Sequence, residues 1–224
     1  MRPVDYRKFR LKYRNTPEFS HVKLLLFWPI FGLFFAFVER VGVSNVYTPI
    51  HIPLDDHIPF CEWFVIPYLF WFVFLIGMLV YTFFFEVPAF RKMMRFVICT
   101  YSVTMAIYIL FPNCQNLRPT AFPRDNILTR FMAWFYTFDT NTNVCPSLHV
   151  IGAVASLYAG WKSRRFGTRP WRIVFVVITV LISLCTVFLK QHSALDVFAA
   201  LPLCALGWWV AEARIPKKKF AQAR

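Results

Sequence analysis

A histidine and an aspartate four positions apart are the first residues in this chain that could do chemistry. If their segment is helical, His192 and Asp196 share one face of the helix. The carboxylate can then accept the imidazole N–H, fix its tautomer and support positive charge while the other ring nitrogen attacks an electrophile. The pair could instead satisfy itself between packed helices. Its place in an apolar segment favours a functional role, because ionisable groups are costly there.

The segment Pro146-Ser147-Leu148-His149 is a second candidate, at the start of another apolar stretch. Proline suits the first turn of a helix, where its missing N–H is not needed. The free N–H groups of such a turn attract anions. Ser147 adds a hydroxyl donor, and His149 is placed to exchange a proton with a bound oxyanion. The alternative is a capped helix with a satisfied histidine.

Three cations could complete a phosphate site with these histidines. Arg118 precedes a proline, Lys190 lies two residues before His192, and Arg124 follows in the same segment as Arg118. A guanidinium grips phosphate oxygens in two-pronged fashion. Each cation could instead extend along the membrane interface. Phosphoryl transfer depends on positioning and electrostatics, so neither a metal nor a cofactor is predicted.

The composition indicates which elements must position these residues. Of the 224 residues, 58% are hydrophobic and 20% aromatic, and the mean hydropathy is +0.50. Soluble domains seldom bury so much apolar surface, whereas about 20 apolar residues make one membrane-spanning helix. We therefore predict an all-α polytopic membrane protein, a single domain over 1–224, with six transmembrane helices at 22–39, 63–85, 93–112, 145–162, 172–190 and 194–212.

The positive charges predict the orientation of these spans. Of the 25 Lys and Arg residues, seven lie before position 24, three at 91–95, five at 162–172 and five at 214–224, which leaves five for the other side. By the positive-inside rule, both termini are cytoplasmic, with a basic N-terminal tail over 1–21 and a basic C-terminal tail over 213–224. The tails are expected to touch anionic membrane lipids. Nucleic-acid binding is excluded, because the aromatic residues fall in the spans.

Three polar clusters lie at one membrane face, outside the cytoplasm, when the chain is traced through these spans. They are Arg118-Pro119, Pro146 to His149, and Lys190 to Asp196. Two long outer segments, 40–62 and 113–144, lie at the same face, and the second resembles a packed loop or a short interfacial helix. The stretch HIPLDDH at 51–57 could be a metal cluster or could contact a substrate head group, but its prolines favour a solvated loop. A disulfide between Cys114 and Cys145 is one option for the outer cysteines.

The order Arg118-Pro119, Pro146 to His149, then His192 to Asp196 resembles the type 2 phosphatidic acid phosphatase superfamily of membrane enzymes. Three departures shift the resemblance toward the branch of sphingomyelin synthases and inositol phosphorylceramide synthases. Phe111 replaces the family's first-motif lysine, Leu148 replaces a glycine, and Cys185 and Thr186 replace a serine–arginine pair.

The resemblance implies a metal-independent enzyme in which His192 attacks phosphorus and forms a phosphohistidine. Asp196 would orient His192, and His149 would protonate the leaving alcohol and then activate the acceptor. The expected substrate is a phospholipid, or an isoprenyl or sphingolipid phosphate, handled at the periplasmic, extracellular or lumenal side.

Water as the acceptor makes the protein a lipid phosphatase that hydrolyses a phosphate monoester or pyrophosphate, which is the expectation we favour. A ceramide, diacylglycerol or other alcohol as the acceptor makes it a lipid phosphotransferase. A third hypothesis is a lipid transporter or binding protein that binds lipid at the polar residues around His149 and His192 without turnover. That hypothesis predicts that His192→Ala weakens binding and abolishes no reaction.

Overall fold

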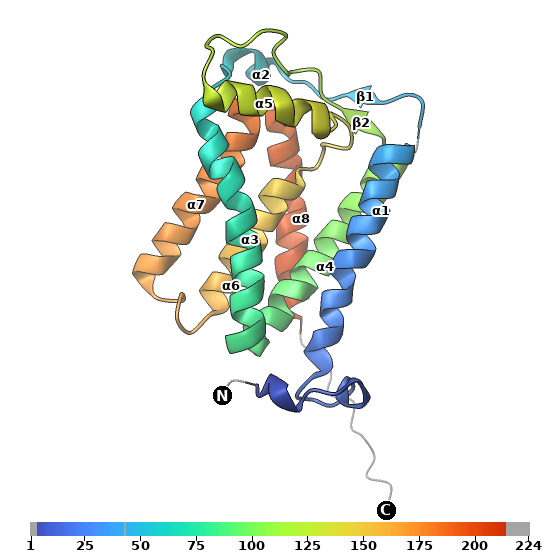
Figure 1. Cartoon of the computed structure of the whole chain (residues 1–224), viewed down its shortest axis with the longest axis vertical. Helices are drawn as coiled ribbons and strands as arrows, with labels where there is room; N and C mark the ends of the chain where they lie inside the picture. The colour runs from blue at the N-terminus through green and yellow to red at the C-terminus, as the bar shows by residue number, and fades with distance from the viewer. Residues whose placement is uncertain (1–3, 43, 214–224) are drawn as a thin grey trace, which may run out of the picture.

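The structure is a computed structural model that describes residues 4–42 and 44–213, and it is built almost entirely from helices. Four helices of 19 to 24 residues and two of 15 form a bundle in the described part of the chain, and a cap of short elements covers one end of it (Figure 1). The bundle helices are α1 (Phe27–Val41), α3 (Val65–Phe85), α4 (Val87–Leu110), α6 (Leu148–Lys162), α7 (Arg169–Phe188) and α8 (Ala194–Glu212). The short elements are η1 (Tyr6–Lys8), η2 (Leu11–Tyr13), η3 (Ser20–Leu26), β1 (Thr48–Pro49), α2 (Pro53–His57), η4 (Glu62–Phe64), β2 (Asn113–Cys114) and α5 (Ile127–Phe138).

Five helical stretches are long and apolar enough to cross a membrane. They are Ser20–Val41, Glu62–Phe85, Val87–Leu110, Arg169–Phe188 and Ala194–Glu212. The predicted span at 145–162 instead forms α6, which has 15 residues and would reach only about 22 Å. Helix α6 can be short because it is surrounded by protein: it packs against α3, α4, α7 and α8.

Small residues let the helices approach α6 and each other closely. A Cβ at Gly160 would overlap the ring of Phe175 on α7, and one at Gly207 on α8 would overlap Thr100 and Phe96 on α4. Such small residues are typical of interfaces between membrane helices, where close van der Waals packing drives association. The buried face of α6 is mostly Ala, Gly and Val for the same reason.

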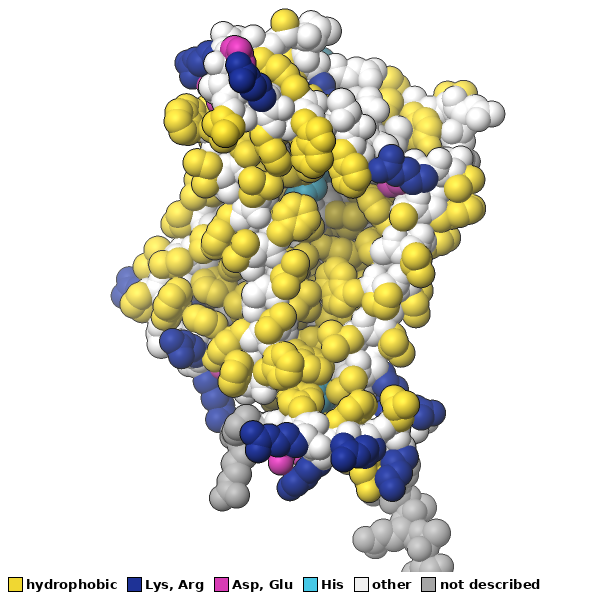
Figure 2. Space-filling view, in the orientation of Figure 1, with side chains coloured by type: hydrophobic (Ala, Val, Ile, Leu, Met, Phe, Trp, Pro, Cys, Tyr) yellow, Lys and Arg dark blue, Asp and Glu magenta, His cyan; other side chains and the backbone are white. Residues whose placement is uncertain are grey.

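The outer surface of the bundle carries large apolar side chains, in contrast to the small residues between its helices. Large apolar side chains cover the middle of the molecule, and most of the visible Lys and Arg side chains gather at the end opposite α5 (Figure 2). Ile66 and Val73 on α3 and Val177 on α7 are examples, with at least half of each side chain exposed. A wide apolar belt of this kind matches a lipid environment.

The capped end is held by pairings between segments distant in sequence. Strand β1 pairs in parallel with β2, with Thr48 opposite Asn113, and an isolated bridge joins Cys114 to Thr142. Helix α5 lies across this end of the bundle (Figure 1), with Asn126 as its N-cap. Of the two alternatives for 113–144, a packed loop or a short interfacial helix, the structure has a helix over part of the segment.

Helix α1 stands apart from the rest of the bundle. It contacts α4 and the preceding η3, and its span is largely exposed. The N-terminal segment up to η3 lies at the end opposite the cap (Figure 1). Of the predicted C-terminal tail at 213–224, all but Ala213 lies outside the described residues. The six cysteines are free, so the structure has no bond between Cys114 and Cys145.

Candidate active site

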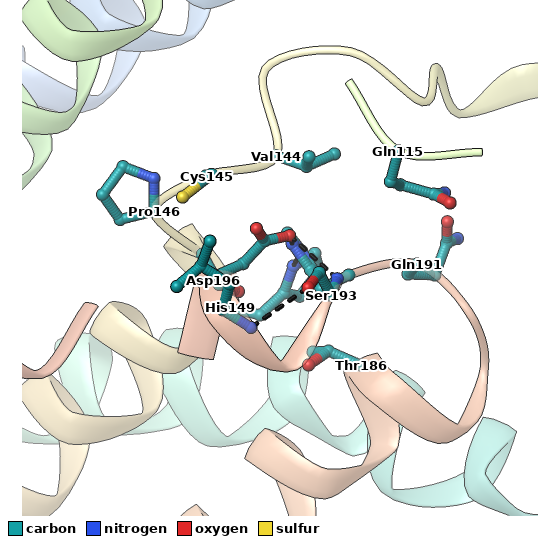
Figure 3. Close-up of polar contacts among 12 residues, drawn as sticks. Gln115, Val144, Cys145, Pro146, His149, Thr186, Gln191, Ser193 and Asp196 are labelled. Atoms are coloured by element: carbon teal, nitrogen blue, oxygen red, sulfur yellow. Dashed lines mark hydrogen bonds and ion pairs between the residues drawn. The ribbon is translucent and has the colours of Figure 1, made fainter. Parts of the chain in front are cut away.

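His149, His192 and Asp196 form a continuous hydrogen-bonded chain at the capped end of the bundle. The Nδ1 atom of His192 lies 3.0 Å from Oδ2 of Asp196, and its Nε2 lies 3.3 Å from Nδ1 of His149. Figure 3 shows the His149 and Asp196 side chains converging at the start of α8. Because an ionised carboxylate only accepts, His192 carries its proton on Nδ1, which leaves a lone pair on Nε2.

His192 is fixed by the loop that enters α8. Its backbone N–H and that of Gln191 both donate to the carbonyl of Thr186, at 3.0 and 2.9 Å. Ser193 then caps α8, with its hydroxyl accepting from Leu195 N and its own N–H donating to Asp196 Oδ2. Asp196 is fully buried and His192 is 6% exposed. The nucleophile candidate is therefore rigidly placed and shielded from bulk water.

His149 is placed by the first turn of α6. Ser147 is the N-cap and is fully buried, its hydroxyl accepts from Val150 N, and its backbone N–H donates to the carbonyl of Asp196. Asn113 clamps the preceding turn, because its Oδ1 accepts from Val144 N and Cys145 N and its Nδ2 donates to Cys145 O. Ser147 thus holds the helices together and is not among the residues that line the cavity described next.

A cavity of about 330 Å³ opens beside the two histidines. Aromatic rings from α1, α3, α4 and α5 form most of its wall, and Figure 2 shows a histidine in a hollow of the apolar surface below α5. The rings of Trp71 and Tyr68 flank His149, with centroids 4.5 and 4.9 Å away. Aromatic faces at such distances can stabilise an imidazolium by cation–π attraction.

Two carboxyl groups also line this cavity. Glu39 on α1 accepts from Asn143 Nδ2 at 2.7 Å and from the hydroxyl of Thr140. Asp139, at the end of α5, lies 3.4 Å from the Arg118 guanidinium. Burial raises the pKa of Asp139, although Arg118 opposes the shift. No Lys or Arg is among the described residues that line the cavity.

Arg118 lies behind the cavity wall and bonds to the protein itself. Its Nη1 donates to Tyr136 O and Asp139 O, and its Nη2 donates to Thr140 O at 2.9 Å and to Gln191 Oε1 at 2.7 Å. Its guanidinium also lies 4.6 Å from the ring centre of Tyr136. Arg118 therefore ties the end of α5 to the loop that carries His192.

The other two predicted cations bond elsewhere. Lys190 has a left-handed backbone, φ 53°, and its Nζ donates to the carbonyl of Asp55 at 2.8 Å. Arg124 pairs with Glu62 at 3.1 Å, and its side chain is 66% exposed. Neither residue lines the cavity, so the structure does not bring Lys190 or Arg124 to the histidines.

Several site residues were missed by the sequence reasoning. The sequence predicted a solvated loop around Asp55. In the structure Asp55 is only 1% exposed and accepts hydrogen bonds from Ser193 Oγ and Ala194 N. That expectation was wrong for Asp55 and right for its neighbour Asp56, which is exposed. Within residues 4–42 and 44–213, no three His, Cys, Asp or Glu side chains are placed to hold a metal ion. The sequence offered only a weak indication of three further cavity residues, because each is simply a polar residue at or near the end of a predicted span. They are Glu39, Asp139 and Gln191.

Comparison of the chain with protein-family models, with curated proteins and with solved structures found no match. The conclusions about function below therefore depend on the site itself.

Proposed function

We propose that the protein is a membrane enzyme that hydrolyses a lipid phosphate monoester or pyrophosphate through a phosphohistidine at His192. The observation that carries the proposal is the chain from Asp196 through His192 to His149, which opens into an apolar cavity. The two flanking groups have the types required for nucleophilic catalysis by an imidazole: one orients it and one exchanges protons. The sequence resemblance to the type 2 phosphatidic acid phosphatases suggests the same chemistry.

The first step is attack of the His192 Nε2 lone pair on phosphorus. The P–N bond forms as the P–O bond to the leaving group breaks, and protonated His149 gives its proton to the leaving oxygen. Asp196 accepts the N–H of the cationic phosphohistidine and offsets its charge. In the second step His149 takes a proton from water, the water oxygen bonds to phosphorus and the P–N bond breaks, which releases phosphate and restores both rings.

The contact between the two imidazoles must open for this reaction. Nε2 of His192 faces Nδ1 of His149 at 3.3 Å, so the lone pair that attacks is already engaged. A phosphate ester that binds from the cavity side would exchange this contact for one between His149 and the leaving oxygen. Lipid tails would then lie along the aromatic wall of the cavity, against the side chains that α1 and α3 contribute to it.

The orientation in the membrane follows from the charges. The loop 162–172 and the start of α4 lie at the end opposite α5 and are basic, and so is the N-terminal segment there. With six crossings, α6 included, both termini would be cytoplasmic and the site would face the periplasm, the lumen or the exterior. The substrate would be a phospholipid or an isoprenyl or sphingolipid phosphate.

A lipid phosphotransferase is a second candidate, and one observation favours it. A phosphate monoester can carry two negative charges and a diester only one, yet no Lys or Arg among the described residues lines the cavity, while Glu39 and Asp139 do. That charge balance suits a phosphodiester better. An alcohol such as a ceramide or diacylglycerol would then replace water in the second step.

Release of phosphate by purified protein in detergent tests the proposal. The substrates are phosphatidic acid, an isoprenyl diphosphate and a labelled phosphodiester lipid with an added ceramide or diacylglycerol. His192→Ala should abolish turnover, whereas His51→Ala should retain it because His51 is an exposed histidine outside the cavity. Turnover that survives His192→Ala contradicts the proposal, and lipid binding without any turnover supports the transport or binding alternative.

A further inference from the structure

Gln191 occupies the position directly before the proposed nucleophile and shares its cavity. Its side chain is 2% exposed, and it lines the cavity together with His149 and His192. Its backbone N–H donates to Thr186 O, the same carbonyl that holds the N–H of His192. Figure 3 shows Gln191 on the loop that leads into α8. The side chain is therefore as firmly placed as the histidine itself.

The orientation of the Gln191 amide follows from its partner. Nη2 of Arg118 lies 2.7 Å from Oε1 of Gln191, and a guanidinium only donates hydrogen bonds. The oxygen must therefore face Arg118, and the NH2 group points away from it. This Nε2 is buried and makes no hydrogen bond of normal length and angle to any residue that the structure describes.

An unpartnered buried donor requires an explanation. Leaving one unsatisfied costs the free energy of its lost hydration, so native structures usually avoid it. The Gln191 side chain forms a weak hydrogen bond to the Asp139 carboxylate that lowers its pKa, but burial acts more strongly and raises that pKa. The Asp139 carboxylate also accepts from Arg118 and is only a weak acceptor for Gln191. A phosphate oxygen bound at Nε2 of His192 would be a strong one.

Arg118 does not line the cavity itself but bonds to three residues that do, Asp139, Thr140 and Gln191, and only its bond to Gln191 orients an unused donor. Its two terminal nitrogens donate to three backbone carbonyls, to the Asp139 carboxylate and to Gln191. The donors of Arg118 are therefore engaged, apart from its buried Nε, and Arg118 does not line the cavity. Its positive charge polarises the Gln191 amide, which makes the NH2 group a better donor to an anion.

We propose that the Gln191 side-chain amide binds a non-bridging phosphate oxygen of the substrate, and that Arg118 is a positioning residue that presents this amide. This inference rests on the proposed phosphoryl transfer at His192. A fixed neutral donor would replace the free cations that the cavity lacks. It would stabilise the charge on the equatorial oxygens as the P–N bond forms.

Two substitutions at Gln191 test the role of the donor. Gln191→Met keeps the size and removes the amide, and Gln191→Glu keeps the shape but replaces the donor with an acceptor. Each should lower kcat about 10²- to 10³-fold, which is typical for loss of one donor to a developing oxyanion. Gln191→Glu should be the more damaging of the two, because its charge repels phosphate.

The matched control is Gln115→Met. Gln115 is also fully buried and its Nε2 also lacks a hydrogen-bond partner among the described residues, but it does not line the cavity. Rates per folded molecule should stay within a few-fold of the parent protein. Melting temperatures measured beside the rates show whether any variant has simply unfolded. Equal losses for the Gln115 and Gln191 variants would overturn the proposal.

A double-mutant cycle separates Gln191 from Arg118. If Arg118 acts through the amide, Arg118→Lys combined with Gln191→Met should be no slower than the worse single variant. If Arg118 instead binds phosphate by itself, the two fold-losses should multiply. Multiplicative losses would therefore contradict the positioning role of Arg118.

Binding of inorganic phosphate gives a readout that needs no turnover. Excess phosphate, compared with chloride at equal ionic strength, should raise the melting temperature of the parent protein and of His192→Ala. It should not raise that of Gln191→Glu. A full shift in Gln191→Glu overturns the Gln191 inference even if His192 proves catalytic. The protein could also show no turnover, while phosphate raises its melting temperature only when Gln191 is present. That result would support the phosphate site and contradict only the enzymatic proposal.

Discussion

Asp55, in the short helix α2 at the capped end, accepts a hydrogen bond from the Ser193 hydroxyl at 2.5 Å, across 138 positions of sequence. The same carboxylate accepts from Ala194 N at 2.8 Å and from Ile52 N at 2.9 Å. It lies at the N-terminus of α8, where a negative charge is favourable. The segment that contains α2 therefore holds the N-terminus of α8 and the loop that carries His192.

Asp55→Asn should reduce both stability and turnover. The amide can satisfy fewer of the three donors, so we expect the free energy of unfolding to fall by about 1–3 kcal/mol. The control is Asp56→Asn, whose carboxylate is exposed and pairs with His51, and we expect a change within about 0.5 kcal/mol. Thermal melts and initial rates on the same preparations measure the two effects. Equal behaviour of the two variants would refute the role of Asp55.

Asp196→Asn should leave the fold in place and greatly reduce turnover. The amide can donate to Nδ1 of His192, which would move the ring proton to Nε2 and remove the attacking lone pair. A change of tautomer of this kind lowers kcat by about 10³- to 10⁴-fold in histidine-based sites. Nitrogen-15 NMR of the histidine rings can report the tautomer directly. Normal turnover with an unchanged tautomer would show that Asp196 does not orient His192.

Glu39→Ala should weaken substrate binding more than chemistry. Glu39 joins α1 to Thr140 and Asn143, and all three line the cavity. Without this link the wall formed by α1 can shift, so we expect KM to rise several-fold with a smaller change in kcat. Glu39→Gln keeps one acceptor and should lie between the parent and Glu39→Ala. A loss confined to kcat would instead place Glu39 in the chemical step.

Asp139 should make stability depend on pH in a direction opposite to that of most carboxylates. Its pKa is raised above 3.8, chiefly by burial, so the folded protein binds this proton more tightly than the unfolded chain. The contribution is fully present below about pH 3.8 and is lost as pH rises through the folded pKa. Asp139→Asn should therefore gain melting temperature relative to the parent as pH rises from 4 toward 7, on the order of a few degrees. A difference in melting temperature between Asp139→Asn and the parent that becomes smaller over this pH range would contradict the raised pKa of Asp139.

The hydrogen bond between His192 and Asp196 was predicted from helical spacing and is present, but His192 lies in the loop before α8, so the capping turn at Ser193 brings the two side chains together. The alternating direction of the spans predicted His149 and His192 at the same end of the molecule. The structure places them at one end, in contact with each other. The shared end is set by topology, which the sequence displays, whereas the contact itself depends on the tertiary fold.

The roles of the cations could not be read in the same way. Arg118 was expected to grip phosphate, but its bonds go to carbonyls at the end of α5 and to Gln191. Lys190 was expected beside His192, but its left-handed backbone sends the side chain to Asp55 O. Side-chain direction in a turn depends on tertiary contacts, and nothing in the local spacing encodes it. The short α6 was missed because its apolar composition matches both a lipid-facing span and a helix buried by its neighbours.

The central claim is that His192 becomes phosphorylated during turnover. The most direct measurement is a rapid quench of the parent protein with a phosphorus-labelled lipid substrate, followed by mapping of the labelled residue under alkaline conditions that preserve phosphohistidine. We expect label on the peptide that contains His192, an increased amount in His149→Ala if the second step slows, and none in His192→Ala. Turnover with no label on His192, or label that persists in His192→Ala, would contradict this account.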